Sequence, residues 1–143
     1  MPNTLVWGTA NPKGLGPDYN GIYLTNHDIQ KMVEQVSAAQ REGQVIPVMI
    51  EHKGPEVGRV VSAWEHDDTL QCLLEIDEKT LEGALGCEFV RTGMCRDLSL
   101  GYMLDMAQSK SGVKVGNKKL KEISIVKKGA RKNCHIHGMG KYT

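Results

Sequence analysis

The clearest pattern of apolar and polar positions begins just after residue 24 and repeats at helical spacing. The apolar positions of this stretch are Ile29, Met32, Val33 and Val36. Thr25 or Asn26 can cap the amino end of the helix, because a hydroxyl or amide oxygen accepts from free backbone N–H groups there. Gly43 is suited to ending it. The sequence therefore predicts an amphipathic helix from about residue 25 to residue 43.

Short apolar runs predict strands on the far side of this helix. Residues 45–50 are rich in β-branched side chains, and Pro47 within them favours an edge position or the start of a strand. Residues 57–64 and 70–76 are joined by a polar turn at 65–69, which is typical of a β-hairpin. Residues 4–7 form a further short extended piece within a Gly- and Pro-rich amino-terminal stretch.

The second half of the chain predicts one more helix and two more strands. Leu81, Leu85 and Phe89 follow one another at four-residue steps and favour a helix over 80–92, although its glycines lower the helix propensity. Residues 98–104 and 120–126 are apolar strand candidates. The Ser-, Gly- and Lys-rich segment 108–119 between them predicts an exposed hairpin or a loop. Together these elements indicate a single α+β domain over residues 1–143, with an antiparallel sheet or small barrel and helices packed outside.

The composition narrows the class of partner. Eighteen basic and seventeen acidic side chains leave a formal charge of +1, so no net field favours a nucleic acid or a membrane surface. Apolar runs fall far short of the roughly 20 residues that span a bilayer, which predicts a soluble protein. We expect a protein or peptide partner. The four cysteines are expected to be reduced thiols in an intracellular setting; they are Cys72, Cys87, Cys95 and Cys134.

Three residues in separate strand-like segments suggest nucleophilic chemistry. Ser99 lies between an upstream His52 and a downstream Glu122. A serine hydroxyl needs a base, an imidazole titrates near neutrality, and a carboxylate can orient that imidazole. Strand alternation places Glu122 and Ser99 opposite their apolar neighbours. Each residue also has an ordinary interpretation: Ser99 as a solvated strand hydroxyl, Glu122 as a side chain on the solvent-exposed face of a half-buried strand, and His52 as a loop residue.

Two further segments contain candidate functional residues, one for binding an oxyanion and one for binding a metal ion. Residues 127–133 contain Gly129 among basic side chains, so this turn can present backbone N–H donors to an oxyanion, or it is a solvated basic turn or an anion-binding patch. Cys134, His135 and His137 include zinc-ligand types at alternate positions, but no second ligand motif accompanies them. Either histidine is also a spare partner for His52.

The order of these motifs resembles the herpesvirus capsid maturation protease, often called assemblin, and the related prohead proteases of tailed phages. In that family an apolar strand ends in the catalytic histidine and a Val-Gly step follows, which is similar to residues 48–52 and 57–60 here. The nucleophile lies in a Leu-Ser-Leu context, as in residues 98–100. The third catalytic residue then leads into a Gly-Arg-Arg turn, which is similar to the stretch from Glu122 to Gly129-Ala130-Arg131.

The resemblance implies an antiparallel β-barrel core with a few helices packed outside. It implies a serine endopeptidase with Ser99 as nucleophile, His52 as base and Glu122 as orienting residue, and with Ala130 and Arg131 at the oxyanion hole. It requires no cofactor and no metal. The implied substrate is the internal scaffold protein, together with the precursor from which the protease releases itself during capsid maturation.

The resemblance also implies a setting and partners. These are a procapsid interior, in the nucleus or the cytoplasm of the host cell, capsid shell proteins, and a homodimer or higher oligomer. Glu122 departs from the second histidine of the herpesvirus enzymes and is similar to the acidic residue of phage prohead proteases. Two alternatives are a non-catalytic β-domain that binds scaffold or capsid protein, and a small metal-binding protein.

Overall fold

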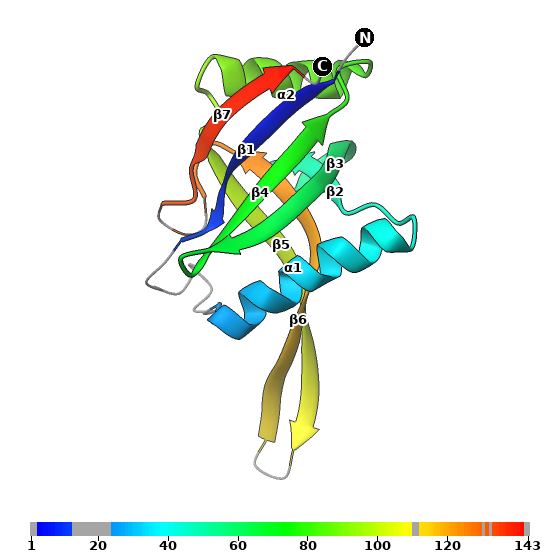
Figure 1. Cartoon of the computed structure of the whole chain (residues 1–143), viewed down its shortest axis with the longest axis vertical. Helices are drawn as coiled ribbons and strands as arrows, with labels where there is room; N and C mark the ends of the chain where they lie inside the picture. Colours follow the sequence, from blue (N-terminus) through cyan, green and yellow to red (C-terminus); the bar gives the residue numbers. More distant parts are fainter. Residues whose placement is uncertain (1–2, 13–23, 110–111, 130, 132, 142–143) are drawn as a thin grey trace.

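The computed structural model describes residues 3–12, 24–109, 112–129, 131 and 133–141, with side chains described outside residues 104–117. Within them lie two helices and seven strands (Figure 1). In chain order the elements are β1 (Thr4–Asn11), α1 (Asn26–Arg41), β2 (Pro47–Ile50), β3 (Lys53–His66), β4 (Thr69–Ile76), α2 (Leu81–Arg91), β5 (Asp97–Ser109), β6 (Gly112–Val126) and β7 (Ile136–Lys141).

The seven strands form one curled sheet in the order β5-β6-β2-β3-β4-β1-β7. A backbone bridge between Asp97 at the start of β5 and His135 just before β7 joins the two ends of this order, so the sheet closes into a half-barrel. The predicted α+β class is confirmed, with both helices outside the sheet (Figure 1). The sheet is mixed, because β2 pairs in parallel with β6 while the other neighbouring strands are antiparallel.

Helix α1 forms where the apolar period predicted it. Thr25 is its N-cap and makes a reciprocal capping box with Asp28, which satisfies backbone N–H groups that the helix itself cannot pair. Ile29, Met32 and Val36 are buried against the sheet. In Figure 1 the helix runs across the strands, while α2 lies near the point where β1 begins and β7 ends.

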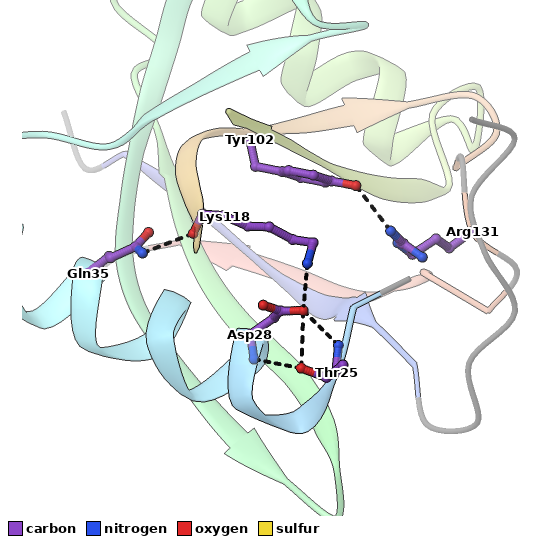
Figure 2. Close-up of polar contacts among 6 residues, drawn as sticks. All are labelled: Thr25, Asp28, Gln35, Tyr102, Lys118 and Arg131. Carbon is purple, nitrogen blue, oxygen red and sulfur yellow. Dashed lines mark hydrogen bonds and ion pairs between the residues drawn. The ribbon is translucent and has the colours of Figure 1, made fainter. Parts of the chain in front are cut away.

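Polar contacts fasten α1 to β6 (Figure 2). The Gln35 amide donates to the carbonyl oxygen of Lys118 at 3.1 Å and accepts from the N–H of Leu120 at 2.7 Å, as a neighbouring strand would. Lys118 Nζ donates to Asp28 Oδ2 at 2.9 Å, and both side chains are nearly buried. The helix thereby covers an edge of β6 that β2 is too short to reach, since β2 pairs only with residues 123–125.

The other predicted elements also form; β1, β3, β5 and β6 are longer than expected and β2 is shorter. Pro47 begins β2, and β3 and β4 make the predicted hairpin around Asp67 and Asp68, which both have positive φ. Helix α2 is capped by Thr80. The segment predicted as a hairpin or loop is part of the β5–β6 hairpin, whose far end projects from the body in Figure 1. Strand β7 was not predicted.

The hydrophobic core is one cluster of buried side chains to which the strands and both helices contribute. All four cysteines are free and buried, as expected for thiols. Among the described residues, no helix is long and apolar enough to cross a membrane. The largest fully buried side chains include Leu24, Ile29, Met32, Leu70, Leu74, Ile76, Leu98, Ile123 and Ile125.

Candidate active site

Ser99 lies on the face of the β5–β6 ladder that carries the polar side chains of both strands. The register pairs Ser99 with Ser124 and Gly101 with Glu122. Directly paired residues of an antiparallel ladder point to the same face, so these four positions share one surface. Ile123 and Ile125 point to the opposite face and are fully buried in the core.

His52 reaches this surface from an unusual turn between β2 and β3. Glu51 and His52 have φ of 53° and 60°, which is the left-handed region normally taken by Gly or Asn in a two-residue hairpin. Such residues cost roughly 1–2 kcal/mol each. Bonds to β6 and to the residue after it hold the turn: the Glu51 N–H donates to the Ile125 carbonyl at 3.1 Å, and the Lys127 N–H donates to Glu51 Oε1 at 2.6 Å. The parallel pairing of β2 with β6 places the turn beside Ser124.

The structure brings together the three side chains that the sequence singled out. His52 Nε2 lies 2.8 Å from Ser99 Oγ, and His52 Nδ1 is hydrogen-bonded to Glu122 Oε1. A carboxylate oxygen only accepts, so Nδ1 carries the proton and the lone pair of Nε2 faces the serine hydroxyl. Ser99 and Glu122 are buried, whereas the His52 side chain is 38 % exposed.

The environment of His52 favours its charged form. The hydrogen bond that His52 Nδ1 donates to Glu122 raises the pKa of His52 above its ordinary value of 6.5, and the charges of Glu122 and Glu51 act in the same direction. Partial burial works to lower the pKa but is outweighed. This arrangement stabilises an imidazolium, which is the species that forms when an imidazole removes a proton from a hydroxyl.

Two residues of this surface were not identified from the sequence. Ser124 Oγ donates to Glu122 Oε2 at 2.7 Å and accepts from the His52 backbone N–H at 3.0 Å. Gly101 leaves the space in which the Glu122 side chain lies, because a Cβ there would stand 2.0 Å from Glu122 Oε1. A glycine inside a predicted strand does signal a close approach, but only the strand register shows what approaches.

The segment after β6 passes beside Ser99. Asp97 Oδ2 accepts from the Gly129 N–H at 2.8 Å, and Asp97 Oδ1 bonds to His135 Nδ1 at 2.8 Å, so one carboxylate ties both ends of the segment to β5. Arg131 is 8 % exposed and donates to the Tyr102 hydroxyl at 3.3 Å (Figure 2). Ala130, the other predicted oxyanion residue, lies outside the described residues. A cavity of about 20 Å³ is lined by residues that include Ser99, Tyr102 and Arg131.

The structure does not bring the three metal-ligand candidates together. Cys134 Sγ points to the Ala10 carbonyl, His135 bonds to Asp97, and His137 Nε2 lies 2.6 Å from Thr9 Oγ1. In the part of the chain that the structure describes, no group of three His, Cys, Asp or Glu side chains is placed to hold a metal ion. Both histidines therefore have partners other than His52.

The fold is similar to that of a viral protease of known structure. Comparison with solved structures finds similarity to Kaposi's sarcoma-associated herpesvirus protease in complex with a hexapeptide phosphonate inhibitor, with a TM-score of 0.63 and 15 % identity over 96 % of this chain. The same protease in complex with an allosteric inhibitor, compound 733, gives a TM-score of 0.58 and 15 % identity, covering 98 % of this chain and 77 % of that one. The chain has the herpesvirus protease fold.

The likeness lies in the structure and not in the sequence. No protein-family profile matches the chain, and no curated protein matches it in sequence. The chain spans 65 % of the length of the herpesvirus protease in the phosphonate complex. The expected herpesvirus-type fold is thus confirmed, whereas the predicted relation to phage prohead proteases stays a prediction.

Proposed function

We propose that this chain is a serine endopeptidase in which Ser99, His52 and Glu122 are the catalytic residues. One observation carries the proposal: His52 Nε2 lies 2.8 Å from Ser99 Oγ, while His52 Nδ1 is hydrogen-bonded to Glu122 Oε1. A base within hydrogen-bond reach of a hydroxyl, itself oriented by a third group, is the geometry that activates a serine. The fold shared with a herpesvirus protease supports the same reaction class.

The reaction follows from the three side chains. Ser99 Oγ attacks the carbonyl carbon of a peptide bond while its proton moves to His52 Nε2. Glu122 stabilises the resulting imidazolium through Nδ1. His52 then gives the proton to the departing amine, which breaks the C–N bond and leaves an ester on Ser99. Water, deprotonated by His52, attacks that ester and releases the acid.

The hydrogen-bond donors that stabilise the oxyanion of the reacting carbonyl are assigned to the segment that follows β6. We place the donors at the backbone of Ala130 and Arg131, as the order of motifs implies. Two observations support this assignment: Arg131 lines the same small cavity as Ser99, and Asp97 ties Gly129 to the strand of the nucleophile. Preorganised backbone N–H groups at such a position typically supply about 10²–10³-fold in rate each.

The proposed substrate is the internal scaffold protein of a viral procapsid, with self-release from a precursor as a second cleavage. Capsid shell proteins are further proposed partners, and a homodimer or higher oligomer is the proposed active form. The proposed setting is the procapsid interior, in the cytoplasm of the host for a phage-type enzyme and in the nucleus for a herpesvirus-type enzyme; the acidic Glu122 is similar to the phage enzymes, and the fold is similar to a herpesvirus protease. The chemistry needs no cofactor.

Cleavage of a proteome-derived peptide library, read by mass spectrometry, tests the activity. The wild-type chain is expected to create new peptide termini with a shared local sequence, and Ser99→Ala is expected to create none. Ser37→Ala provides the matched control, because Ser37 is exposed on α1, away from the site. Equal cleavage by wild type and Ser99→Ala would refute the assignment of the nucleophile.

The second candidate function is a non-catalytic domain that binds scaffold or capsid protein. The low overall charge and the absence of a metal cluster among the described residues leave a protein partner as its natural ligand. A wild-type chain that produces no new termini yet retains scaffold precursor on a column would favour this function.

A further inference from the structure

Ser124 connects the two residues that would prepare Ser99 for attack. Its hydroxyl donates to Glu122 Oε2 at 2.7 Å and accepts from the backbone N–H of His52 at 3.0 Å. The one hydroxyl therefore contacts the main chain of the base and the carboxylate that orients it. Ser124 itself pairs with Ser99 across the β5–β6 ladder, so it lies at the centre of the site without reaching the reacting atoms.

We infer that Ser124 is a positioning residue: it locks the His52 turn and the Glu122 carboxylate into one geometry, so that the imidazole is held between Glu122 and Ser99. The inference rests on the proposed function, because the geometry matters for rate only if Ser99 is the nucleophile. The contacts of Ser124 exist whether or not the chain is a protease. They can therefore be tested without a substrate.

Burial makes these two bonds difficult to replace. Ser124 has no exposed surface, and Glu122 is only 8 % exposed. Water has little access to a carboxylate oxygen or an N–H group in such a place, and a buried polar group without a partner is costly. Replacing the hydroxyl by hydrogen would leave Glu122 Oε2 and the His52 N–H unpaired together. The carboxylate would then be free to rotate away from His52 Nδ1.

The His52 turn has a backbone conformation that depends on bonds from its surroundings. Glu51 and His52 both have left-handed backbone angles, which non-glycine residues adopt only when their surroundings hold them there. Three bonds to β6 and to the residue after it do so, and the one made by the His52 backbone is its N–H bond to Ser124 Oγ. Since the imidazole direction follows from the backbone of residue 52, Ser124 fixes both ends of the His52–Glu122 pair.

The charged groups near His52 determine the pKa that a titration of its imidazole would measure. Glu122 faces the imidazole from β6, and Glu51 lies beside it on the same turn. Ser99 is the polar neighbour on β5. A loosened Glu122 would weaken the hydrogen bond that raises the pKa of His52, while Glu51 would stay in place. Loss of Ser124 should therefore move the pKa of His52 down toward 6.5.

The test is an NMR titration of the His52 ring in the full chain, comparing wild type with Ser124→Ala, Ser124→Cys and Ser124→Thr. Ser124→Ala and Ser124→Cys should lower the pKa of His52, whereas Ser124→Thr keeps the hydroxyl and should restore it. Ser62→Ala on β3 is the matched control and should leave the titration unchanged. If Ser124→Ala fails to fold, Ser124→Cys serves in its place, because it preserves nearly the same volume.

Cleavage kinetics separate this inference from the proposed function. On a peptide that the wild type cleaves, Ser124→Ala should lower kcat by about 10- to 100-fold with little change in KM, as expected when a reacting group is misplaced. A His52 titration that is unchanged in Ser124→Ala and Ser124→Cys would overturn the inference even if the wild type is active. A wild type that cleaves nothing, with the titration shifted as stated, would refute the protease alone.

Discussion

Gly101 lies directly across the β5–β6 ladder from Glu122, and the Glu122 side chain fills the space that a Cβ at residue 101 would occupy. That Cβ would stand 2.0 Å from Oε1, 2.6 Å from Cδ and 2.9 Å from Cγ of Glu122. The position of the carboxylate therefore depends on the absence of a side chain on the neighbouring strand. A glycine in a strand interior otherwise only weakens the strand.

Gly101→Ala should move the Glu122 carboxylate away from His52 while leaving the fold in place. The contacts of the added methyl are with a flexible side chain and not with backbone, so the side chain can swing aside at little cost. We expect cleavage to fall by about 100-fold, in line with the effect of a 1 Å misplacement. Gly140→Ala is the control, because its Cβ meets only ordinary contacts with Trp7. A fully active Gly101→Ala would contradict the role of Glu122.

The pH profile of cleavage should report the raised pKa of His52. Only the neutral imidazole can accept the proton of Ser99, so kcat/KM should rise with pH through a midpoint above 6.5. Glu122→Gln removes the main cause of the raised pKa, which should shift the midpoint toward 6.5 and lower the plateau by about 10²–10⁴-fold. An unchanged pH profile in Glu122→Gln would show that a residue other than Glu122 orients His52.

The same pKa has a consequence for stability. Because the pKa of His52 is raised in the folded state, its pairing with Glu122 contributes stability that is fully present below 6.5 and is lost as the pH rises through the folded-state pKa. Glu122→Gln should therefore reduce the difference in unfolding midpoint between pH 6 and pH 9. Urea unfolding at the two pH values measures this, and a difference equal to that of the wild type would contradict it.

Lys118→Met should destabilise the chain by about 3 kcal/mol, as is typical when one partner of a buried ion pair is removed. Asp28 would lose the cation that bonds its Oδ2 at 2.9 Å, although its bonds to Thr25 would remain. Lys119→Met is the matched control, because Lys119 is exposed on the same strand. Urea unfolding at neutral pH distinguishes the two variants, and equal stability would contradict the importance of this pair.

The pair also gives a prediction at acid pH. Burial acts to raise the pKa of Asp28, but the backbone of Thr25 and the ammonium of Lys118 outweigh it, so the pKa lies below 3.8. A lowered carboxyl pKa contributes stability that is present above 3.8 and lost as the pH falls through the folded-state value. Lys118→Met should therefore show a weaker loss of stability between pH 5 and pH 2 than wild type.

Local patterns predicted most of the elements, because their causes are local. The period of Ile29, Met32 and Val36 reports one face of a helix, and the Thr25 hydroxyl reports its cap. Strand alternation likewise placed Ser99 and Glu122 on one face, which the β5–β6 register confirms. Such signals need only neighbouring residues.

What the sequence did not reveal depends on contacts distant along the chain. The parallel pairing of β2 with β6 and the left-handed turn at Glu51 and His52 are stabilised by residues of β6, about 70 positions away. Strand β7 has Gly138 and Gly140, which are poor strand formers, and it forms because the Trp7 ring covers them from β1. The sequence around Ser124 is that of an ordinary strand serine, because its partners, the His52 N–H and Glu122 Oε2, are set by the fold.

The most direct test of Ser99 as the activated nucleophile is the reaction of the native chain with a fluorophosphonate, followed by mass spectrometry of the digested adduct. An activated serine hydroxyl should attack the phosphorus, and the adduct should map to Ser99 alone. The adduct should form much more slowly in His52→Ala and should be lost in Ser99→Ala. Labelling at another serine would contradict Ser99 as the nucleophile, and labelling of Ser99 at the same rate without His52 would contradict His52 as its base.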